Sequence, residues 1–268
     1  MKYKMIFLDI DGTLTNSEKK ITPKTKAALI KAQEMGIIAA IASGRPDKGV
    51  SKYIKELELE RFGGYVLSYN GGRIREMKTG RTVIERSIAP QVFAEAHRFA
   101  HVSGVDILTY RGDVILAENP ENKYLEIESR INGMPVEIHP DITSAVFFNV
   151  PKCLLLGDGD RMSDLEPNLK VRLFGRADVF RSEPFFLEVM PYKTDKAAAI
   201  ANLCAVLGIE REETMAFGDG FNDVSMISHA GMGVAMENAC EAAKKAADFI
   251  TLSNEDDGIA YALEKFVF

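Results

Sequence analysis

The chain has 268 residues, a length typical of one large domain or two modest ones, and we expect two. Its 33 Lys and Arg residues against 39 Asp and Glu residues leave a formal net charge of −6 at pH 7. This composition lacks the basic excess that binds a nucleic-acid backbone or an anionic membrane, so we expect neither as a partner. Hydrophobic residues make up 46% of the chain and charged residues 27%, which is the range of globular proteins rather than disordered ones.

The sequence favours a cytosolic protein. Its longest unbroken apolar run, residues 37–42, is far shorter than the roughly 20 residues that a membrane-spanning helix needs. Another apolar run, residues 5–8, is interrupted by Asp9 before the apolar core of a signal peptide forms. Cys153, Cys204 and Cys240 are widely spaced and form no CxxC, which argues against a disulfide framework and against a thiolate zinc site.

Four short apolar runs each end abruptly in a polar or glycine-rich turn, which is typical of parallel strands that feed a crossover helix. These are residues 4–8 before Asp9, 37–42 before Ser43-Gly44-Arg45, 65–67 before Tyr69-Asn70-Gly71, and 214–217 before Gly218-Asp219-Gly220. A helix is predicted over residues 23–35, because Pro23 suits a first turn and Gly36 a stop. The pattern predicts an open parallel sheet with helices on both faces, a Rossmann-like core.

The same alternation continues near the end of the chain. A second long helix is predicted over residues 195–207, ending at Gly208, and shorter helices after Asn222 and Asn238. The shorter helices alternate with apolar runs near Val234 and Phe249, which predict further strands.

The middle of the chain has a different pattern, which predicts an α+β insert. Residues 105–110 and 114–117 resemble a hairpin around Arg111-Gly112-Asp113, and amphipathic helices are expected near 90–102 and 120–131. We therefore predict an α/β core formed by residues 1–80 and 190–268, with residues 81–189 inserted as a second domain. Gly157-Asp158-Gly159-Asp160, inside the insert, is expected to be a turn or a helix cap rather than a second metal site.

Polar side chains follow the four core strands, and the carboxyl ends of such strands meet at one edge of a sheet, where ligands bind. The residues expected to converge there are Asp9, Asp11, Ser43, Arg45, Asn70, Asp219, Asn222 and Asp223, with Lys196 on the helix before the fourth strand. Four carboxylates in one crevice repel one another unless a cation is present, and oxygen ligands favour a hard ion such as Mg²⁺. The sequence therefore predicts a magnesium site with Asp9, Asp11, Asp219 and Asp223 as its acidic residues.

Asp9 and Asp11 are two residues apart at a strand end, so both lean toward the same side if the extended path continues. A carboxylate on the metal stays ionised and attacks an electrophile, whereas a neighbour off the metal holds a proton for the leaving group. Ser43 and Gly44 offer a hydroxyl and an unobstructed N–H, and Lys196 adds a positive charge. Together with the tight turn at Gly12 these groups predict a phosphate-sized pocket.

Other interpretations of these motifs fit less well. Asp9-Ile10-Asp11-Gly12 differs from a helix–loop–helix calcium loop, because its glycine is fourth rather than sixth and position twelve is Lys20 instead of Glu. The turn at Gly218 begins like a dinucleotide fingerprint, but Asp223 at the sixth position repels a pyrophosphate in the absence of a metal. Turn formation and helix capping explain any one of the motifs easily and all four together poorly.

These motifs resemble those of the haloacid dehalogenase superfamily. The matching residues are Asp9-Ile10-Asp11-Gly12-Thr13-Leu14, Ser43-Gly44-Arg45, Lys196 and Gly218-Asp219-Gly220-Phe221-Asn222-Asp223. Tyr69-Asn70-Gly71 resembles an additional turn of its Cof-type (subclass IIB) phosphatases, whose large α/β cap is inserted where residues 81–189 lie here. The resemblance implies a Mg²⁺-dependent phosphatase acting on a small phosphorylated metabolite, sugar phosphates first and phosphorylated cofactors such as flavin mononucleotide or pyridoxal phosphate second.

The resemblance also implies roles for individual residues. Asp9 would be the nucleophile that forms an aspartyl-phosphate, and Asp11 the acid that protonates the leaving group and later activates water. Mg²⁺ would be held by Asp9, the backbone carbonyl of Asp11 and Asp219, with Asp223 and Asn222 in support. The phosphoryl group would be bound by Gly12, Ser43, Gly44, Lys196 and Asn222, and the rest of the substrate by Arg45, Asn70 and Gly71. Arg45 is equally compatible with a solvent-exposed helix cap.

Two alternatives to a phosphatase remain open at this point. Asp11 is typical of phosphatases and phosphomutases, whereas ion-pumping ATPases carry Thr at that place. A phosphomutase of the same superfamily is therefore one alternative, and a non-catalytic sugar-phosphate-binding protein is the other. No pattern in the sequence indicates an oligomeric state.

Overall fold

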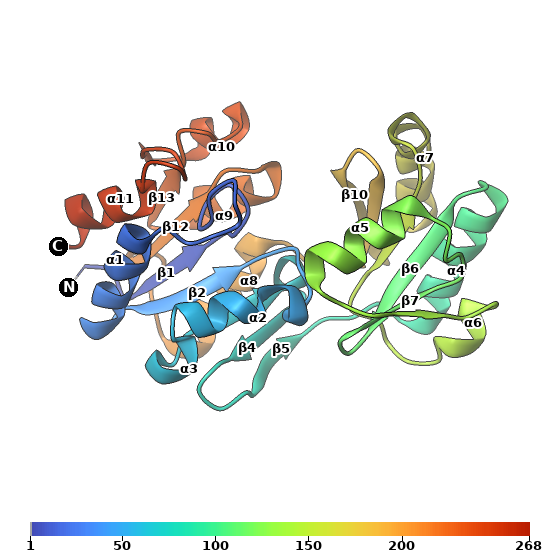
Figure 1. Ribbon diagram of the computed structural model, residues 1–268, viewed down its shortest axis with the longest axis horizontal. Coiled ribbons are helices and arrows are strands. Elements are labelled where there is room, and N and C mark those ends of the chain that lie inside the picture. Colours follow the sequence, from blue (N-terminus) through green and yellow to red (C-terminus); the bar gives the residue numbers. More distant parts are fainter. Residues whose placement is uncertain (1) are drawn as a thin grey trace. The chain divides into compact units, whose positions relative to one another are not determined.

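The structure is a computed structural model that describes residues 2–268, and it divides into two compact units (Figure 1). The first unit comprises residues up to Gly44, Val50–Ile84 and Asp195–Phe268; the second comprises Arg45–Gly49 and Glu85–Thr194. These boundaries fall a few residues later than the predicted ends at 80 and 189, and the short segment Arg45–Gly49 groups with the second unit instead of the first. That the second unit acts as a specificity cap stays a prediction.

The first unit is built on an eight-stranded sheet. In spatial order its strands are β14 (Phe249–Ile250), β13 (Met232–Ala235), β12 (Thr214–Gly218), β1 (Met5–Leu8), β2 (Ile38–Ala42), β3 (Tyr65–Ser68), β4 (Arg73–Glu76) and β5 (Thr82–Glu85). The strands from β14 to β3 are parallel, as predicted. β4 runs antiparallel to β3 and was not predicted, because its sequence Arg-Ile-Arg-Glu has one apolar residue and a half-exposed outer face.

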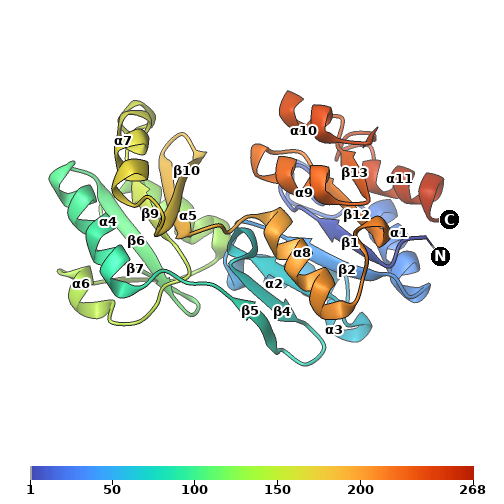
Figure 2. The same cartoon turned by 180° about the vertical axis from the view of Figure 1, so that it is seen from behind.

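Helices cover both faces of this sheet. They are α1 (Pro23–Glu34), α2 (Asp47–Glu56), α3 (Leu59–Phe62), α8 (Lys196–Leu207), α9 (Val224–His229), α10 (Glu241–Ala246) and α11 (Gly258–Phe266). α1 and α2 lie in front of the sheet in Figure 1, and α8 and α9 lie in front of it in Figure 2, which shows the opposite side. Each strand from β1 to β3 is therefore apolar on both faces, and its side chains are almost completely buried.

The helix boundaries follow from local chemistry. α1 begins after Thr22, whose hydroxyl accepts a hydrogen bond from the Thr25 amide, and Pro23 occupies the first turn. α8 begins after Asp195, which accepts from the Ala198 amide at 2.7 Å, and ends at Gly208 in the left-handed conformation. Both predicted long helices of the core are thus confirmed.

β1 lies inside the sheet, and the strands that follow it in the sequence are added first on one side of β1 and later on the other. Leu8 pairs with Ile41 of β2 on one side and with Phe217 of β12 on the other, so the carboxyl ends of the three strands are level. The sheet grows through β2 and β3 in one direction and through β12 and β13 in the other. Open α/β sheets bind their ligands at such a reversal point, directly beyond the strand ends.

The second unit contains a mixed six-stranded sheet. Its strands, in spatial order, are β10 (Ala177–Glu183), β11 (Phe186–Pro191), β9 (Cys153–Leu156), β6 (Asp106–Arg111), β7 (Val114–Ala117) and β8 (Val136–Ile138). Its helices are α4 (Pro90–Val102), α5 (Lys123–Asn132), α6 (Ile142–Ala145) and α7 (Gly159–Arg172). The predicted hairpin is confirmed by the antiparallel pairing of β6 with β7, and the two predicted helices by α4 and α5.

Several elements of the second unit were not predicted, among them α7 and the hairpin of β10 and β11. The helix α7 contains Pro167 in its interior, a residue that normally argues against a helix. The hairpin of β10 and β11 has an exposed end with a register shift between Arg181 and Glu183, which removes the regular alternation of a strand. Among the described residues, none of the helices combines the length and the apolarity needed to span a bilayer.

Candidate active site

The residues that follow the core strands meet at one edge of the first sheet. Asp9 comes directly after β1, and its amide donates to the Phe217 carbonyl of β12 at 3.0 Å. Ser43 comes directly after β2 and accepts the Asn70 amide at 2.8 Å through its own carbonyl. These backbone bonds join neighbouring strands beyond their formal ends, so the turns are fixed relative to one another.

Three carboxylates form a tight group at this edge. Asp9, Asp219 and Asp223 each offer an oxygen, and the three oxygens lie within 4.8 Å of one another. Asp9 is 7% exposed and Asp223 only 1%. Asp9 and Asp219 are 210 positions apart in the sequence, so it is the fold that brings them together.

Lys196 inserts its ammonium into this group. Its Nζ donates to Oδ1 of Asp9 at 2.5 Å and to Oδ1 of Asp223 at 2.6 Å, and the residue is 1% exposed. Lys196 is the first residue of α8, which Asp195 caps, so the start of the helix determines where the ammonium lies. Such charge-assisted bonds are the strong class of hydrogen bond.

Asp223 is held on both of its oxygens. While Oδ1 accepts from Lys196, Oδ2 accepts the backbone amides of Asp219 and Gly220 at 3.0 and 2.9 Å. Asp223 therefore closes the turn that carries Asp219 and at the same time positions Lys196. This double engagement fits a supporting role for Asp223 better than a reacting one.

Gly12 and Thr13 approach Asp219 from the turn that follows Asp9. A Cβ at Gly12 would lie 2.3 Å from Oδ2 of Asp219, and its φ of +81° is also unfavourable for other residues. The Thr13 hydroxyl donates to Oδ1 of Asp219 at 2.7 Å. The requirement for glycine at position 12 is thus both conformational and steric.

The electrostatics of the group are unbalanced. Burial raises the pKa of Asp9 from 3.8 to about 8, and the charge of Asp223 adds to this increase while Lys196 opposes it. Burial likewise raises the pKa of Asp219 to about 6. Burial by itself would lower the pKa of Lys196, but the charges of Asp223 and Asp9 outweigh it and raise that pKa above its ordinary value.

A divalent cation fits this imbalance. Three carboxylates face one ammonium, so full ionisation leaves two negative charges without compensation. The donor set consists of oxygens alone, which suits a hard ion such as Mg²⁺ and not a soft thiolate-binding metal. The expectation that residues 9 and 219 lie close enough to share an ion is met by the geometry.

The carboxylate of Asp11 stands apart from the other three. Its Oδ1 accepts from Lys19 Nζ at 2.8 Å, and the side chain is 39% exposed. The predicted group of four acidic side chains is therefore a group of three in this structure, because the chain turns sharply at Gly12 after Asp11. The expectation that Asp11 contributes its backbone carbonyl to the metal, and not its carboxylate, is compatible with this separation.

The remaining predicted residues have diverse surroundings. Asn222 Nδ2 lies 3.5 Å from Asn70 Oδ1, and a Cβ at Gly44 would contact the same Asn70 amide group, so these three residues are close together. Gly71 lies under α8, where a Cβ would meet that of Ala199 at 2.3 Å, so glycine is required there for packing. Arg45 falls in the second unit, where its guanidinium donates to the Ile131 carbonyl at 3.2 Å.

Sequence reasoning did not identify two further residues near the site. Lys19 contacts Asp11, and Asn238 donates from its side chain to the Gly12 carbonyl at 2.8 Å. Lys19 lies in the polar run Ser17-Glu18-Lys19-Lys20, where nothing distinguishes it from its neighbours. In the sequence, Asn238 is recognisable only as a residue that precedes a predicted helix. Its hydrogen bond joins two positions that most of the chain separates.

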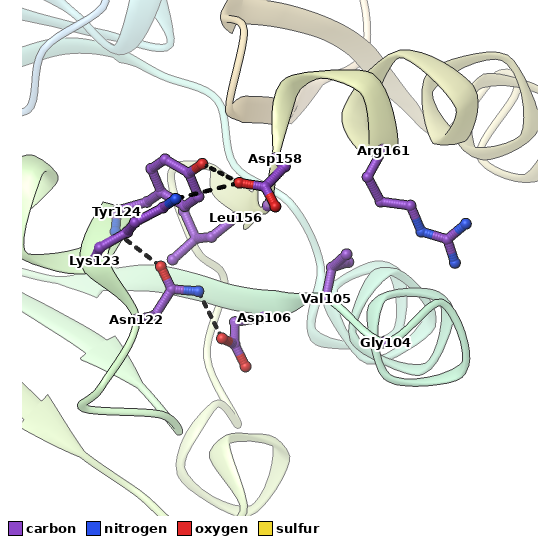
Figure 3. Close-up of a pocket in the computed structure, with 10 residues that line it drawn as sticks. Gly104, Val105, Asp106, Asn122, Lys123, Tyr124, Leu156, Asp158 and Arg161 are labelled. Atoms are coloured by element: carbon purple, nitrogen blue, oxygen red, sulfur yellow. Dashed lines mark hydrogen bonds and ion pairs between the residues drawn. The ribbon is translucent and has the colours of Figure 1, made fainter.

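A separate pocket lies within the second unit (Figure 3). Its acidic residues are paired inside the protein: Asp106 accepts from Asn122 at 2.6 Å, and Asp158 accepts from Tyr124 at 2.6 Å and from Lys123 at 3.3 Å. Asp158 occupies the position before the first turn of α7, as expected from its motif. Among residues 2–268, only the Asp9 group brings three potential metal ligands together, so we place the chemistry there.

The fold and this site are those of a phosphoryl-transfer hydrolase, and comparisons with known proteins agree. Residues 6–263 match the family described as haloacid dehalogenase-like hydrolase. A haloacid dehalogenase-like hydrolase structure from Bacteroides thetaiotaomicron is 44% identical, with a TM-score of 0.93 over 98% of this chain and 99% of that one. A sugar phosphatase of haloacid dehalogenase subclass IIB is 27% identical, with a TM-score of 0.82 over 98% of both chains.

A curated relative from Bacillus subtilis is named 5-amino-6-(5-phospho-D-ribitylamino)uracil phosphatase. It is 30% identical over 267 residues, which cover 98% of this chain and 96% of the relative. The chain therefore belongs to the haloacid dehalogenase superfamily, in its Cof-type group, and it is a phosphatase.

Proposed function

We propose that this phosphatase hydrolyses small phosphomonoesters with the help of Mg²⁺ and through an aspartyl-phosphate on Asp9. The observation that carries the proposal is the buried group of Asp9, Asp219 and Asp223 around the ammonium of Lys196. Phosphoryl transfer requires in-line positioning and charge neutralisation more than covalent chemistry, and this group supports both.

In the first step a carboxylate oxygen of Asp9 attacks phosphorus, forming an O–P bond while the bond to the leaving oxygen breaks. Asp11 gives its proton to that leaving oxygen, so the product departs as a neutral hydroxyl. Lys196 offsets negative charge at Asp9, and Ser43 and Gly44 bind the phosphoryl oxygens. In the second step Asp11 takes a proton from water, which attacks phosphorus, and free phosphate leaves with Asp9 restored.

Mg²⁺, when bound, supplies the positive charge that lets an ionised carboxylate approach a phosphate dianion. The residues that would hold it are Asp9, Asp219 and the backbone carbonyl of Asp11, with Asp223 and Asn222 in support. The two uncompensated negative charges of the group support this assignment.

Sugar phosphates are the substrates we propose first, and phosphorylated cofactors second. The name of the Bacillus subtilis relative describes a substrate with a phosphorylated ribityl chain, and the subclass IIB neighbour is described as a sugar phosphatase. Residues 81–189 would act as the cap that selects the leaving group, together with Arg45, Asn70 and Gly71. The cytosol is the proposed compartment, which agrees with the free thiols of Cys153, Cys204 and Cys240.

A chromogenic ester tests this proposal. We expect the purified chain to release p-nitrophenol from p-nitrophenyl phosphate only with Mg²⁺, and Asp9→Asn to lower the rate by at least about 1,000-fold. Asp113→Asn, at an exposed hairpin turn, is the matched control and should keep full activity. Metal-independent turnover, or an active Asp9→Asn variant, would refute the proposal.

Labelled water separates hydrolysis from the phosphomutase alternative. A hydrolase acting on a sugar phosphate places one oxygen from H₂¹⁸O in the released phosphate, whereas a mutase returns the phosphoryl group to the sugar and releases none. Isomerised sugar phosphate without free phosphate would identify a phosphomutase.

A further inference from the structure

The loop after the first motif places a lysine on the proposed general acid. Lys19 Nζ donates to Oδ1 of Asp11 at 2.8 Å, across eight positions of the chain. The two side chains are 57% and 39% exposed, so the ion pair lies at the open side of the site. An exposed pair of this kind adds little to stability, so any functional effect of the pair comes from the geometry that it imposes on Asp11.

The turn that carries Lys19 is tightly organised. Lys19 has a φ of +58°, in the left-handed region that side chains other than glycine seldom occupy. The carboxamide oxygen of Asn16 accepts the amides of Glu18 and Lys20 at 3.1 and 3.0 Å, and the Lys19 amide donates to the Asn16 carbonyl at 2.9 Å. A side chain that merely reached into solvent would not need so many constraints.

Other elements of the first unit fix the same loop from outside. Lys52 Nζ of α2 donates to the Lys19 carbonyl at 2.6 Å. At the other end of the loop, Asn254 Nδ2 donates to the Thr15 carbonyl at 2.8 Å. The backbone of the loop is thereby held at Thr15 and at Lys19, the residue whose side chain contacts Asp11.

We infer that Lys19 is a positioning residue for the general acid. By donating to one carboxylate oxygen of Asp11, Lys19 restricts rotation of that carboxyl group and directs the second oxygen toward the departing oxygen of the substrate. Proton transfer requires hydrogen-bond distance and alignment, so a freely rotating acid is a poorer catalyst. The inference rests on the proposed role of Asp11 in phosphomonoester hydrolysis.

The adjacent Lys20 provides a matched control. It carries the same charge in the same loop, but its Nζ pairs with Glu18 at 2.7 Å and its side chain is 69% exposed. Lys19→Met and Lys20→Met thus remove the same charge at neighbouring positions, and only the first removes the contact with Asp11. Lys19→Arg keeps a donor and is the conservative variant.

Leaving-group dependence tests the inference. The probes are p-nitrophenyl phosphate, whose leaving group needs little protonation, and phenyl phosphate, whose leaving group depends on an acid. We expect Lys19→Met to lower kcat/KM, which covers only the steps up to departure of the leaving group, by about tenfold more on phenyl phosphate than on p-nitrophenyl phosphate. Lys19→Arg should recover most of this loss, and Lys20→Met should match the unaltered chain on both esters.

A double variant tests whether Lys19 acts through Asp11. If it does, Lys19→Met added to Asp11→Asn causes no further loss on phenyl phosphate, because the group that it positions is already absent. In the single variant, an equal loss of kcat/KM on both esters would identify a structural role for Lys19, and no loss on either ester would identify a surface ion pair without function. In the double variant, additive losses would show that Lys19 and Asp11 act independently. Each of these results overturns the inference while leaving Mg²⁺-dependent hydrolysis intact. Failure of the unaltered chain to hydrolyse either ester would overturn the proposed function as well.

Discussion

Each unit of the molecule buries a lysine against acidic side chains, but the two sites differ in charge balance. In the first unit, Lys196 faces three carboxylates. In the second unit, Lys152 pairs with Glu188 at 3.2 Å, and the side chains are 4% and 5% exposed. The Lys152 ammonium also lies 5.8 Å from the centre of the Tyr110 ring.

The comparison teaches that burial of charge does not by itself mark a reactive site. The Lys152–Glu188 pair sets one ammonium against one carboxylate, although Oε2 of Glu188 is buried without a hydrogen-bond partner. Full ionisation would leave the Lys196 group with two surplus negative charges, and burial together with the charge of Asp223 raises the pKa values of Asp9 and Asp219. A bound cation would compensate a negative surplus of this kind, so the charge imbalance, and not burial alone, supports placing the chemistry at this group.

Removing each lysine should have different consequences for catalysis, and this is the largest effect that we expect. Lys196→Met should lower kcat/KM at saturating Mg²⁺ by about 1,000-fold, because the positive charge beside the nucleophile is lost. Lys152→Met, matched in burial and in chemical change, should alter it less than about threefold per folded molecule. Steady-state kinetics on samples shown to be folded by circular dichroism decides the matter, and comparable losses in the two variants would contradict the distinction.

For the stability of the protein, the Lys152–Glu188 pair should matter more than it does for catalysis. Lys152→Met leaves Glu188 buried without its partner and should lower the free energy of unfolding by about 3–5 kcal/mol. Replacing both partners, as Lys152→Met with Glu188→Leu, should recover most of that loss, since a neutral pair is exchangeable for apolar side chains. Urea unfolding checks both variants. A double variant as unstable as the single one would show that the pair is needed for more than charge balance.

Much of the fold was predictable because its signals are local. The core strands are apolar runs that end in turns, and helices such as α8 have a cap at Asp195 and a stop at Gly208. The elements that escaped prediction contradict a local rule and are stabilised by tertiary contacts. Three of the four residues of β4 are charged, but β4 pairs with β3, and α7 forms despite Pro167 because Leu165 and Leu169 are buried in the second core.

The site was predictable to the extent that strand ends determine it. Asp9, Ser43 and Asp219 follow directly from the position of turns after parallel strands. The separation of the Asp11 carboxylate depends on the direction of the chain after Gly12 and on the approach of Lys19, which no residue pattern reveals. The steric need for Gly71 comes from Ala199, more than a hundred positions away, and is visible only in the packing.

The pH dependence of stability also distinguishes the Lys196 group from the Lys152–Glu188 pair. The pKa of Asp9 is raised from 3.8 to about 8 and that of Asp219 to about 6, so the folded chain holds these protons more tightly than the unfolded chain does. In the metal-free protein, stability present at pH 4 should therefore be lost as the pH rises toward 8. Mg²⁺ at a hundred times its Kd should restore about 2.7 kcal/mol at pH 8 and less at pH 5, where protons compete.

Melting curves in EDTA and in Mg²⁺ across this pH range measure the effect. Asp219→Asn should reduce the response to Mg²⁺, because it removes a proposed ligand, whereas Glu188→Gln should leave that response unchanged. A metal-free protein whose stability increases from pH 5 to pH 8 would contradict the uncompensated charge.

Neutralising one acid should change stability in opposite directions in the two units. In EDTA at pH 9, where Asp9 is ionised, Asp9→Asn should raise Tm by about 3 °C, because it relieves repulsion among the carboxylates. Glu188→Gln should lower Tm under the same conditions, because it removes the charge that balances Lys152. Shifts of the same sign in the two variants would refute the contrast between a balanced and an unbalanced cluster.

The smallest effect concerns single hydrogen bonds outside the clusters. Asn254→Ala removes the bond to the Thr15 carbonyl, and Asn119→Ala removes one to Asp106 of the second unit at 2.9 Å, so each should cost about 1 kcal/mol of unfolding free energy. Only Asn254→Ala should also lower kcat, by a few fold, because Thr15 belongs to the loop that carries Asp11 and Lys19. Urea unfolding and kinetics of both variants separate the two effects. If Asn254→Ala and Asn119→Ala lowered kcat equally, the activity would depend on overall stability. The hydrogen bond that holds the loop at Thr15 would then have no specific effect on catalysis.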